Sequence, residues 1–221
     1  MQSIYYKDLE VTLHHKPHLK HSYIQILPEG KVVIKTPYKS QHFAYELLEK
    51  KELWVRKHLQ KLEQNTQTSI ILQKEVLLFG EVVSISHPSV EPLHSQLQKL
   101  PPDTQDEKVV ACYNHFYKTV AKKYITQRVV YFAQKMQLHY NDIKYRKMKR
   151  RWGSCNSKGV LTFNTQLIKV KKELIDYVVV HELAHLIHMN HSKQFHALVA
   201  FYLPDAYHLR KELHNTQLLL L

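Results

Sequence analysis

Residues 181–195 read HELAHLIHMNHSKQF, and this stretch decides how the chain is interpreted. Apolar residues before and within it recur at helical spacing, which predicts a helix over 172–189. On such a helix His181 and His185 are about 40° apart around the axis and about 6 Å apart along it, so both rings can bind one metal ion. Zn²⁺ binds neutral imidazoles at about 2.1 Å and keeps a position for water in catalytic sites. Glu182 adjoins the first ligand, where a carboxylate can take a proton from that water.

A third ligand would complete such a site, and two candidates follow on the chain. His188 stands on the same helix face, but about 7.5 Å along the axis from the midpoint of the first two ligands, which is further than an imidazole reaches. His191 stands ten residues after His181, the spacing of the third ligand in H-E-x-x-H-x-x-G-x-x-H enzymes. We therefore predict His191 as the ligand, with Asn190 in a left-handed turn and Ser192 as the cap of the next helix.

The abundance of histidine weakens this motif when it is taken alone. With 17 His in 221 residues, the H-E-x-x-H string is expected about 0.08 times by chance, and a further His at one given position lowers this to about 0.006. His188 and His196 stay as alternative ligands. The interpretation without a metal is that these histidines only pack on an apolar helix face.

The composition excludes several classes of protein. A hydrophobic content of 44% and a charged content of 23% are typical of a soluble globular protein and exclude a disordered chain. Four Gly exclude collagen-like sequences and glycine-loop nucleotide sites, and two Cys exclude a disulfide scaffold and a Cys-only zinc site. The start shows no signal peptide and no apolar run is long enough to cross a bilayer, so we expect a cytoplasmic protein without a membrane partner.

The positive charge is confined to one half of the chain. There are 32 Lys and Arg against 19 Asp and Glu, a formal net charge of +13. Residues 1–107 contain 13 of each sign, so the whole excess belongs to residues 108–221. Six cations fall within the eight residues 144–151. Such a run can attract nucleic acid, phosphate-bearing ligands or acidic protein surfaces, or can simply be a solvated face.

The N-terminal part, residues 1–86, is expected to be a β-rich subdomain with one helix. Alternating apolar residues over 9–36 predict a small antiparallel sheet with a turn at 28–30. Ser40 is expected to cap a helix that runs to about residue 64, and two short strands are expected around Gly80. The inward residues expected on the helix are Phe43, Leu47, Leu48, Leu53, Trp54, Leu59 and Leu62.

A linker and a metal-binding domain are expected to follow. Residues 87–107 contain four of the eight Pro and few large apolar residues, which indicates a linker. In the domain over 108–221, a long helix is predicted over 109–136 and strands over 143–149 and 160–166. The inward residues expected on that helix are Cys112, Phe116, Val120, Tyr124, Ile125, Val129, Phe132 and Met136.

The connection between those two strands contains half of the glycines, Gly153 and Gly159. Because glycine adopts backbone conformations that other residues avoid, we expect both of them in tight turns. Cys155 lies in the same connection. We expect it to pack there rather than to act as a redox thiol or nucleophile.

Three segments taken together resemble the YgjP-like family of zinc metallopeptidases, which is related to SprT-like and WLM proteins. They are Arg151-Trp152-Gly153-Ser154-Cys155, the H-E-x-x-H string, and Asn190-His191-Ser192 with Phe195. The resemblance extends over essentially the whole chain. It implies an α+β protein with a zincin-like catalytic core, built from an active-site helix and a small antiparallel sheet, beside the N-terminal strand-rich subdomain.

The resemblance also implies the site. Residues 160–164 would be the strand beside the cleft, where an extended peptide can add its backbone as another strand. The chain departs from the family pattern at His196, where family members often carry Trp. The implied site residues are Glu182 as the catalytic residue and, as ligands of one Zn²⁺ per chain, His181, His185 and His191.

The leading hypothesis from the sequence is a zinc-dependent hydrolase, first of all a metallopeptidase that uses a zinc-bound water with Glu182 as general base. One alternative keeps the metal but takes a phosphate-bearing substrate, as a metal-dependent nucleoside triphosphate pyrophosphatase would. The other is a nucleic-acid-associated protein, as SprT-like relatives suggest, that binds DNA or RNA through the basic strand at 144–151.

Overall fold

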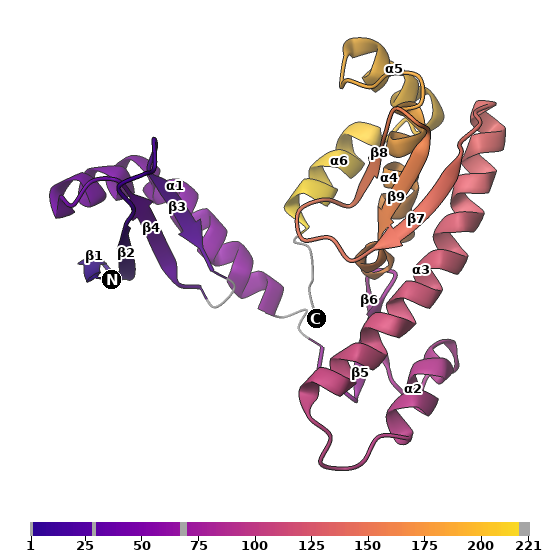
Figure 1. Cartoon of the computed structure of the whole chain (residues 1–221), viewed down its shortest axis with the longest axis horizontal. Helices are drawn as coiled ribbons and strands as arrows, with labels where there is room; N and C mark the ends of the chain where they lie inside the picture. Colours follow the sequence, from indigo (N-terminus) through magenta and orange to yellow (C-terminus); the bar gives the residue numbers. More distant parts are fainter. Residues whose placement is uncertain (1, 28–29, 67–69, 217–221) are drawn as a thin grey trace. The chain divides into compact units, whose positions relative to one another are not determined.

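The computed structural model describes residues 2–27, 30–66 and 70–216 (Figure 1). The chain folds as two compact units, Met1–Ser69 and Ile70–Leu221. This division differs from the expected one, because the hairpin around Gly80 and the expected linker over 87–107 both belong to the second unit.

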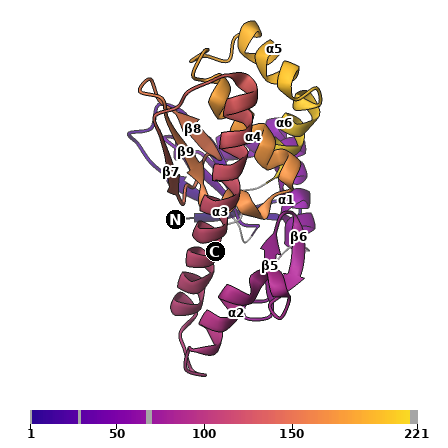
Figure 2. The ribbon, with the colours of Figure 1, turned by 90° about the vertical axis from the view of Figure 1, so that its right-hand side faces the viewer.

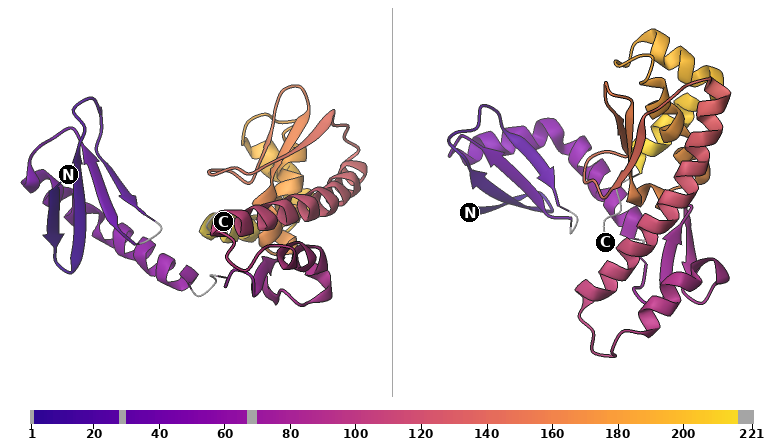
Figure 3. Two further views of the ribbon diagram at one scale, coloured as in Figure 1. Left: turned by 60° about the horizontal axis from the view of Figure 1, so that its bottom comes forward. Right: turned by 45° about the vertical axis from the view of Figure 1, so that its right-hand side comes forward.

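The first unit is a four-stranded sheet covered by one helix (Figure 3). Its strands lie in the order β1-β2-β4-β3, and they are β1 (Gln2–Tyr6), β2 (Leu9–His15), β3 (Tyr23–Ile26) and β4 (Val32–Thr36). The expectation of an antiparallel sheet is wrong at its centre, where β2 and β4 pair in parallel with Val11 opposite Val32. The reason is that β3 takes the outer edge of β4, so the chain crosses over between β2 and β4. Of the expected turn at 28–30, Pro28 and Glu29 lie outside the described residues.

The helix of this unit, α1 (Gln41–Thr66), begins as expected, because the Ser40 hydroxyl accepts a hydrogen bond from the Phe43 backbone N–H at 3.3 Å. Its buried side chains are Ala44, Leu48 and Val55, which pack against the sheet. The expected apolar stripe is too wide, since Leu53 is 87% exposed on the opposite side of the helix. Only one stripe is buried because only one sheet face covers the helix. Leu62 lies outside the residues whose side chains are described.

The second unit is organised along one long helix, α3 (Asp106–Met136), as Figure 2 shows. One end packs against β5 (Glu75–Leu78), β6 (Glu81–Ser84), a short 3₁₀ helix (Pro88–Val90) and α2 (Glu91–Gln98). The other end carries β7 (Asp142–Arg146), β8 (Gly153–Cys155), β9 (Val160–Asn164), a second 3₁₀ helix (Thr165–Lys169), α4 (Lys172–Ala184), α5 (Lys193–Tyr202) and α6 (Ala206–Asn215).

The expected linker is therefore folded. Leu93 and Leu97 of α2 are buried in the core of the second unit, as is Val76 of the hairpin. Gly80 takes a φ of +88° in the hairpin turn, as expected from its position. Its backbone N–H donates to the Lys169 carbonyl at 2.9 Å, which attaches the hairpin to the 3₁₀ helix that precedes α4.

The helix α3 confirms the expected long helix and begins three residues earlier. Of the expected inward residues, Cys112, Val120 and Tyr124 are only partly buried. The helix ends at Gln137, whose φ of 56° is left-handed and whose N–H bonds back to the last turn. The buried residues of α3 are Val109, Tyr113, Phe116, Tyr117, Ala121, Ile125, Val129, Phe132, Ala133 and Met136.

The small sheet of the second unit has the order β7-β9-β8. It is mixed rather than antiparallel as expected, since β7 pairs with β9 in parallel and β8 pairs with β9 antiparallel. Leu161 and Phe163 of β9 are fully buried against the helical layer. The strand β9 therefore lies at the centre of the sheet, and the expectation that residues 160–164 form the free edge beside the cleft is wrong.

Within the described residues, no helix is both long and apolar enough to cross a membrane.

An ion pair between α3 and α4 holds the two central helices together. Arg128 donates to both carboxylate oxygens of Asp176, at 2.6 and 2.7 Å, and both side chains are partly buried. We predict that Asp176→Asn lowers the free energy of unfolding of this unit by about 1–2 kcal/mol, because a paired guanidinium loses its charged acceptor. Urea denaturation in a Trp54→Phe background, in which the fluorescence of Trp152 reports on this unit, measures the change.

Glu212→Gln is the matched control, because the Lys171–Glu212 pair is exposed. It should change the free energy of unfolding by less than about 0.5 kcal/mol. Equal effects of the two substitutions would contradict the prediction that the Arg128–Asp176 pair stabilises this unit more than the exposed pair does.

Candidate metal centre

The helix α4 supplies the first part of the site. Nine of its 13 residues are buried, including Glu182, while His181 is partly exposed. The helix ends at Ala184, so the expectation that it continues to residue 189 is wrong. Its last turn tightens, with the Leu186 N–H bonded to the Leu183 carbonyl at 3.0 Å. His185 is the residue that ends the helix and starts the return of the chain.

The returning chain brings His191 back to α4. Its Nε2 atom lies 3.0 Å from Nε2 of His181. The turn is followed by α5, whose first turn is capped by the Ser192 hydroxyl, which accepts from the Phe195 N–H at 3.2 Å, as expected. Asn190 does not take the expected left-handed conformation, because the chain leaves α4 earlier and needs no such turn.

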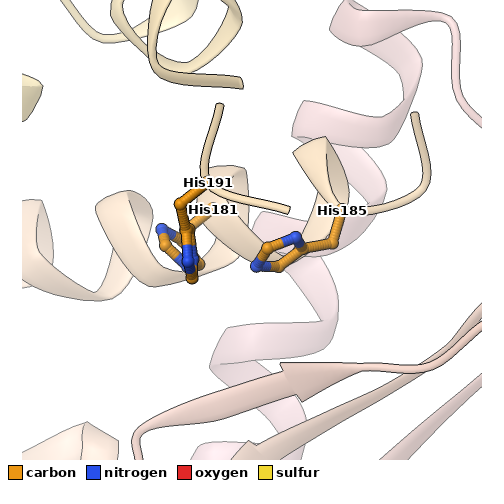
Figure 4. Close-up of side chains that lie close together, drawn as sticks. All are labelled: His181, His185 and His191. Atoms are coloured by element: carbon orange, nitrogen blue, oxygen red, sulfur yellow. The ribbon is translucent and has the colours of Figure 1, made fainter. Parts of the chain in front are cut away.

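The three imidazoles form a nearly equilateral triangle. Their ring centroids are 4.9, 5.0 and 4.8 Å apart, and one nitrogen of each ring lies within 4.8 Å of the others. Figure 4 shows the rings turned toward one another. Ligand nitrogens of a tetrahedral zinc ion are about 3.3 Å apart. The arrangement of His181, His185 and His191 therefore fits one such ion.

The other two candidate histidines lie outside this triangle. His188 contributes its backbone carbonyl, which accepts from Nδ1 of His185 at 3.0 Å. This bond places the proton on Nδ1 and leaves Nε2 of His185 free to bind a metal. The ring of His196 stacks near that of His191, with centroids 6.2 Å apart. Because α4 ends at Ala184, His188 does not stand on the helix as predicted, and the axial distance of about 7.5 Å does not describe its position.

Burial favours the neutral form of His181 and His191. Burial, assisted by His185 and His191, lowers the pKa of His181 to about 3. Its Nδ1 atom is buried and has no hydrogen-bond partner among the described residues. Burial also lowers the pKa of His191. A neutral imidazole has a free lone pair, which is the form that binds a metal ion.

The ring of Phe195 packs against all three imidazoles. It is fully buried, and its ring centroid lies 4.9, 4.6 and 4.9 Å from those of His181, His185 and His191. One aromatic ring thus packs against all three imidazoles and restricts their orientations. The sequence placed Phe195 in a motif but did not indicate this contact, which depends on how α5 folds back over α4.

Glu182 lies beside the triangle and against the backbone of β8. The side chain is 5% exposed, and burial raises its pKa to about 8, while the charge of Arg151 opposes that shift. A Cβ atom at Gly153 would lie 2.6 Å from Oε1 of Glu182. The absence of a side chain at Gly153 therefore allows the carboxyl group to approach the backbone this closely. Gly153 lies in the strand β8, so the expectation of a turn there is wrong. Gly159 does take a turn conformation, with a φ of +68°.

A cleft of about 680 Å³ opens beside His181 and Glu182. Residues 150–153 line one side, α4 contributes the floor, and α6 with the residues after it lines the other side. The cations on its walls are Arg150, Arg151, Arg210 and Lys211.

Asn164 holds the first wall of the cleft in place, and sequence reasoning missed it. Its Nδ2 donates to the carbonyls of Met148 at 2.7 Å and Arg151 at 3.0 Å, and its Oδ1 accepts from the backbone N–H groups of Met148 and Gln166. The side chain is fully buried. An Asn before a short helix is a recognisable cap signal, but its bonds to residues 148–151 depend on the tertiary fold.

The basic run at 144–151 does not form one strand. The strand β7 ends at Arg146, Lys147 donates to the Asn114 side chain at 3.1 Å, and Arg150 and Arg151 face the cleft. The run is therefore divided among different surroundings. Nucleic-acid binding through it stays a prediction.

Cys155 is a poor nucleophile in this setting. Burial raises the pKa of its thiol to about 11, and the nearby Glu182 adds to the shift. The thiol is therefore protonated at neutral pH.

A model of the family described as "YgjP-like, metallopeptidase domain" matches residues 20–216. The chain belongs to the YgjP-like family. Membership indicates a metal-dependent hydrolase with a peptide substrate, and the three-histidine cluster of this YgjP-like chain is compatible with a metal cofactor. Curated proteins include no match to the chain.

Two solved structures are similar to part of this YgjP-like chain. They are the metallopeptidase zymogens of Pyrococcus abyssi abylysin and Methanocaldococcus jannaschii jannalysin, each 20% identical. The first match has a TM-score of 0.38 and covers 40% of this chain and 90% of that one. The second has a TM-score of 0.37 and covers 40% of this chain and 92% of that one.

The contact between Gly153 and Glu182 can be tested by a double-mutant cycle. We predict that Gly153→Ala lowers the free energy of unfolding by about 1–3 kcal/mol, because the new methyl group overlaps the buried carboxyl group. In a Glu182→Ala background the same substitution should cost much less. Urea denaturation of the four proteins measures the coupling, and Ser154→Ala is the neighbouring control. If Gly153→Ala lowers the free energy of unfolding equally in both backgrounds, the added methyl group does not act through Glu182.

The ligand set can be tested by zinc binding. We predict that His191→Ala weakens zinc affinity by more than about 100-fold, because even the loss of a residue that only orients a ligand costs about 10–100-fold. His188→Ala keeps the backbone carbonyl and should stay within about 3-fold of the unmodified protein, as should His196→Ala. Competition with a chelating dye measures the affinities. A large loss in His188→Ala with little in His191→Ala would reverse the assignment.

Proposed function

We propose that the protein is a zinc-dependent metallopeptidase in which His181, His185 and His191 bind one ion per chain and Glu182 is the general base. The observation that carries the proposal is the convergence of three imidazoles that can hold one metal ion, at a site where His181 and the buried Glu182 line a single cleft. Three imidazoles leave a fourth position for water, which is the pattern of catalytic rather than structural zinc sites.

Zinc, when bound, supplies a Lewis acid that polarises a water molecule and the carbonyl group of the scissile bond. Glu182 takes the proton of the attacking water and passes it to the leaving amine. Burial favours its protonated form, and a cation on the imidazoles favours its carboxylate form, so its pKa returns toward neutrality. A base with a pKa near the working pH can both accept and release a proton.

The edge of β8 is the place proposed for the substrate backbone. The strand pairs only with β9 in the sheet order, and residues 150–153, which lead into it, line the cleft. An extended peptide can pair with such an edge, which positions its carbonyl groups. The close approach of Gly153 to Glu182 supports this choice, because Glu182 is the proposed base.

The mechanism predicts a variant that binds metal but does not turn over. Glu182→Gln keeps the size of the side chain and removes the base, so kcat on internally quenched peptides should fall by about 10²–10⁴-fold. Glu173→Gln, which changes an exposed residue of the same helix, is the control and should keep full activity. Zinc content and peptide cleavage are measured on the same samples.

Removing the metal with a chelator should abolish cleavage, and adding zinc back should restore it. Full activity of Glu182→Gln would rule out the proposed base. Peptide cleavage that persists without metal would rule out the metallopeptidase itself.

A further inference from the structure

The walls of the cleft carry charge of one sign. Arg150 and Arg151 lie on the side that leads into β8, and Arg210 and Lys211 lie on α6 across from them. Glu182 is the one acidic residue that lines this cleft among the described residues. Four cations therefore line the cleft that also contains His181 and Glu182.

These four cations are available to a ligand. All four side chains belong to exposed residues, and none of them forms an ion pair within the described part of the chain. The neighbouring Lys171 and Arg128, by contrast, are paired with Glu212 and Asp176 outside the cleft. A cluster of unpaired like charges is unfavourable in itself and is relieved when an anion binds between them.

The cations share the cleft with two residues of the site. All four line the same cleft as His181 and Glu182. A peptide that lies in this cleft with its scissile bond beside Glu182 therefore has its flanking residues next to these cations.

Aromatic side chains stand beside the cations. Trp152 follows Arg151 in the chain and lines the cleft. Tyr207 lines the cleft from α6 and is 73% exposed. A flat apolar surface beside a guanidinium group accommodates the methylene groups of a Glu side chain while its carboxylate meets the cation. The walls therefore match a carboxylate on a short flexible stem.

We propose that this cleft selects peptides with acidic side chains next to the scissile bond, through Arg150 and Arg151 on one wall and Arg210 and Lys211 on the other. The proposal rests on the metallopeptidase function proposed above and names its substrate class. Basic peptides are disfavoured at the same positions, because like charges would approach each other at the centre of the cleft.

The experiment compares internally quenched peptides that differ only by Glu or Gln at the positions flanking the cleaved bond. The zinc-loaded full chain is expected to cleave the Glu peptides with a kcat/KM at least about 10-fold higher, mainly through a lower KM, since the cations bind ground state and transition state alike. The preference should shrink between about 50 and about 500 mM NaCl, because salt screens exposed charges.

The variants assign the preference to the walls. Arg210→Gln with Lys211→Gln, and Arg150→Gln with Arg151→Gln, should each lower the Glu/Gln ratio of kcat/KM toward one. The ratio is taken within each variant, so a change in its overall activity does not affect the comparison. Lys118→Gln with Lys135→Gln removes the same charge from exposed positions of α3 and should leave the ratio unchanged. All six positions are exposed, so the variants are expected to fold, and thermal melting with zinc content verifies this.

The outcomes separate the two proposals. Equal cleavage of the Glu and Gln peptides, or a ratio that survives both cleft variants, overturns the acidic preference and keeps the metallopeptidase. Absence of cleavage of every peptide by the zinc-loaded chain overturns the metallopeptidase. Hydrolysis of a nucleoside triphosphate in place of peptides, lost in the same cleft variants, assigns the cations to phosphate groups and overturns both.

Discussion

The burial of the Glu182 carboxyl group against the backbone of Gly153 is the constraint on which the site depends. A carboxyl group that is 5% exposed loses most of its hydration, and its pKa rises to about 8. The position is possible because no side chain stands at residue 153. It is stable because α4 is enclosed by α3, by the small sheet and by α6, so the helix cannot turn the carboxyl group toward solvent. The same enclosure makes the adjacent imidazole of His181 neutral and therefore able to bind a metal ion.

Hydrogen bonds between side chains and the backbone orient most of the remaining polar site. The carbonyl of His188 sets the tautomer of His185, the cap at Ser192 fixes the turn that carries His191, and Asn164 binds the carbonyls of the segment that forms one wall of the cleft. These bonds hold the ligands and one wall of the cleft, but none of them involves the four cations of the cleft. The cations of the proposed specificity belong to the walls of the cleft.

Features with a local cause were predicted well from the sequence. The helix over 109–136, the caps at Ser40 and Ser192 and the turn at Gly80 all follow from neighbouring residues, and all are present. Features that depend on pairing across the fold were not. Three such features are the parallel pairing of β2 with β4, the central place of β9 and the exposure of Leu53. They depend on which strands pair and which faces pack together, and a pattern of alternating apolar residues is compatible with several such arrangements.

The sequence by itself determined which histidines come together. Helical geometry brings residues four apart together, so the approach of His181 to His185 was expected from the chain alone, and His191 was expected from its spacing. The path of the chain to His191 was not, because α4 ends at Ala184 and Asn190 is not left-handed. Only the tertiary structure showed that Gly153 leaves room for the Glu182 carboxyl group and that the Phe195 ring contacts all three imidazoles. It also brought Arg151 and Arg210 into one cleft. The physical reason is that these contacts join separate elements. Contacts within a few residues are set by the geometry of one helix, whereas Gly153, Phe195 and Arg210 reach the site only because their elements pack around α4.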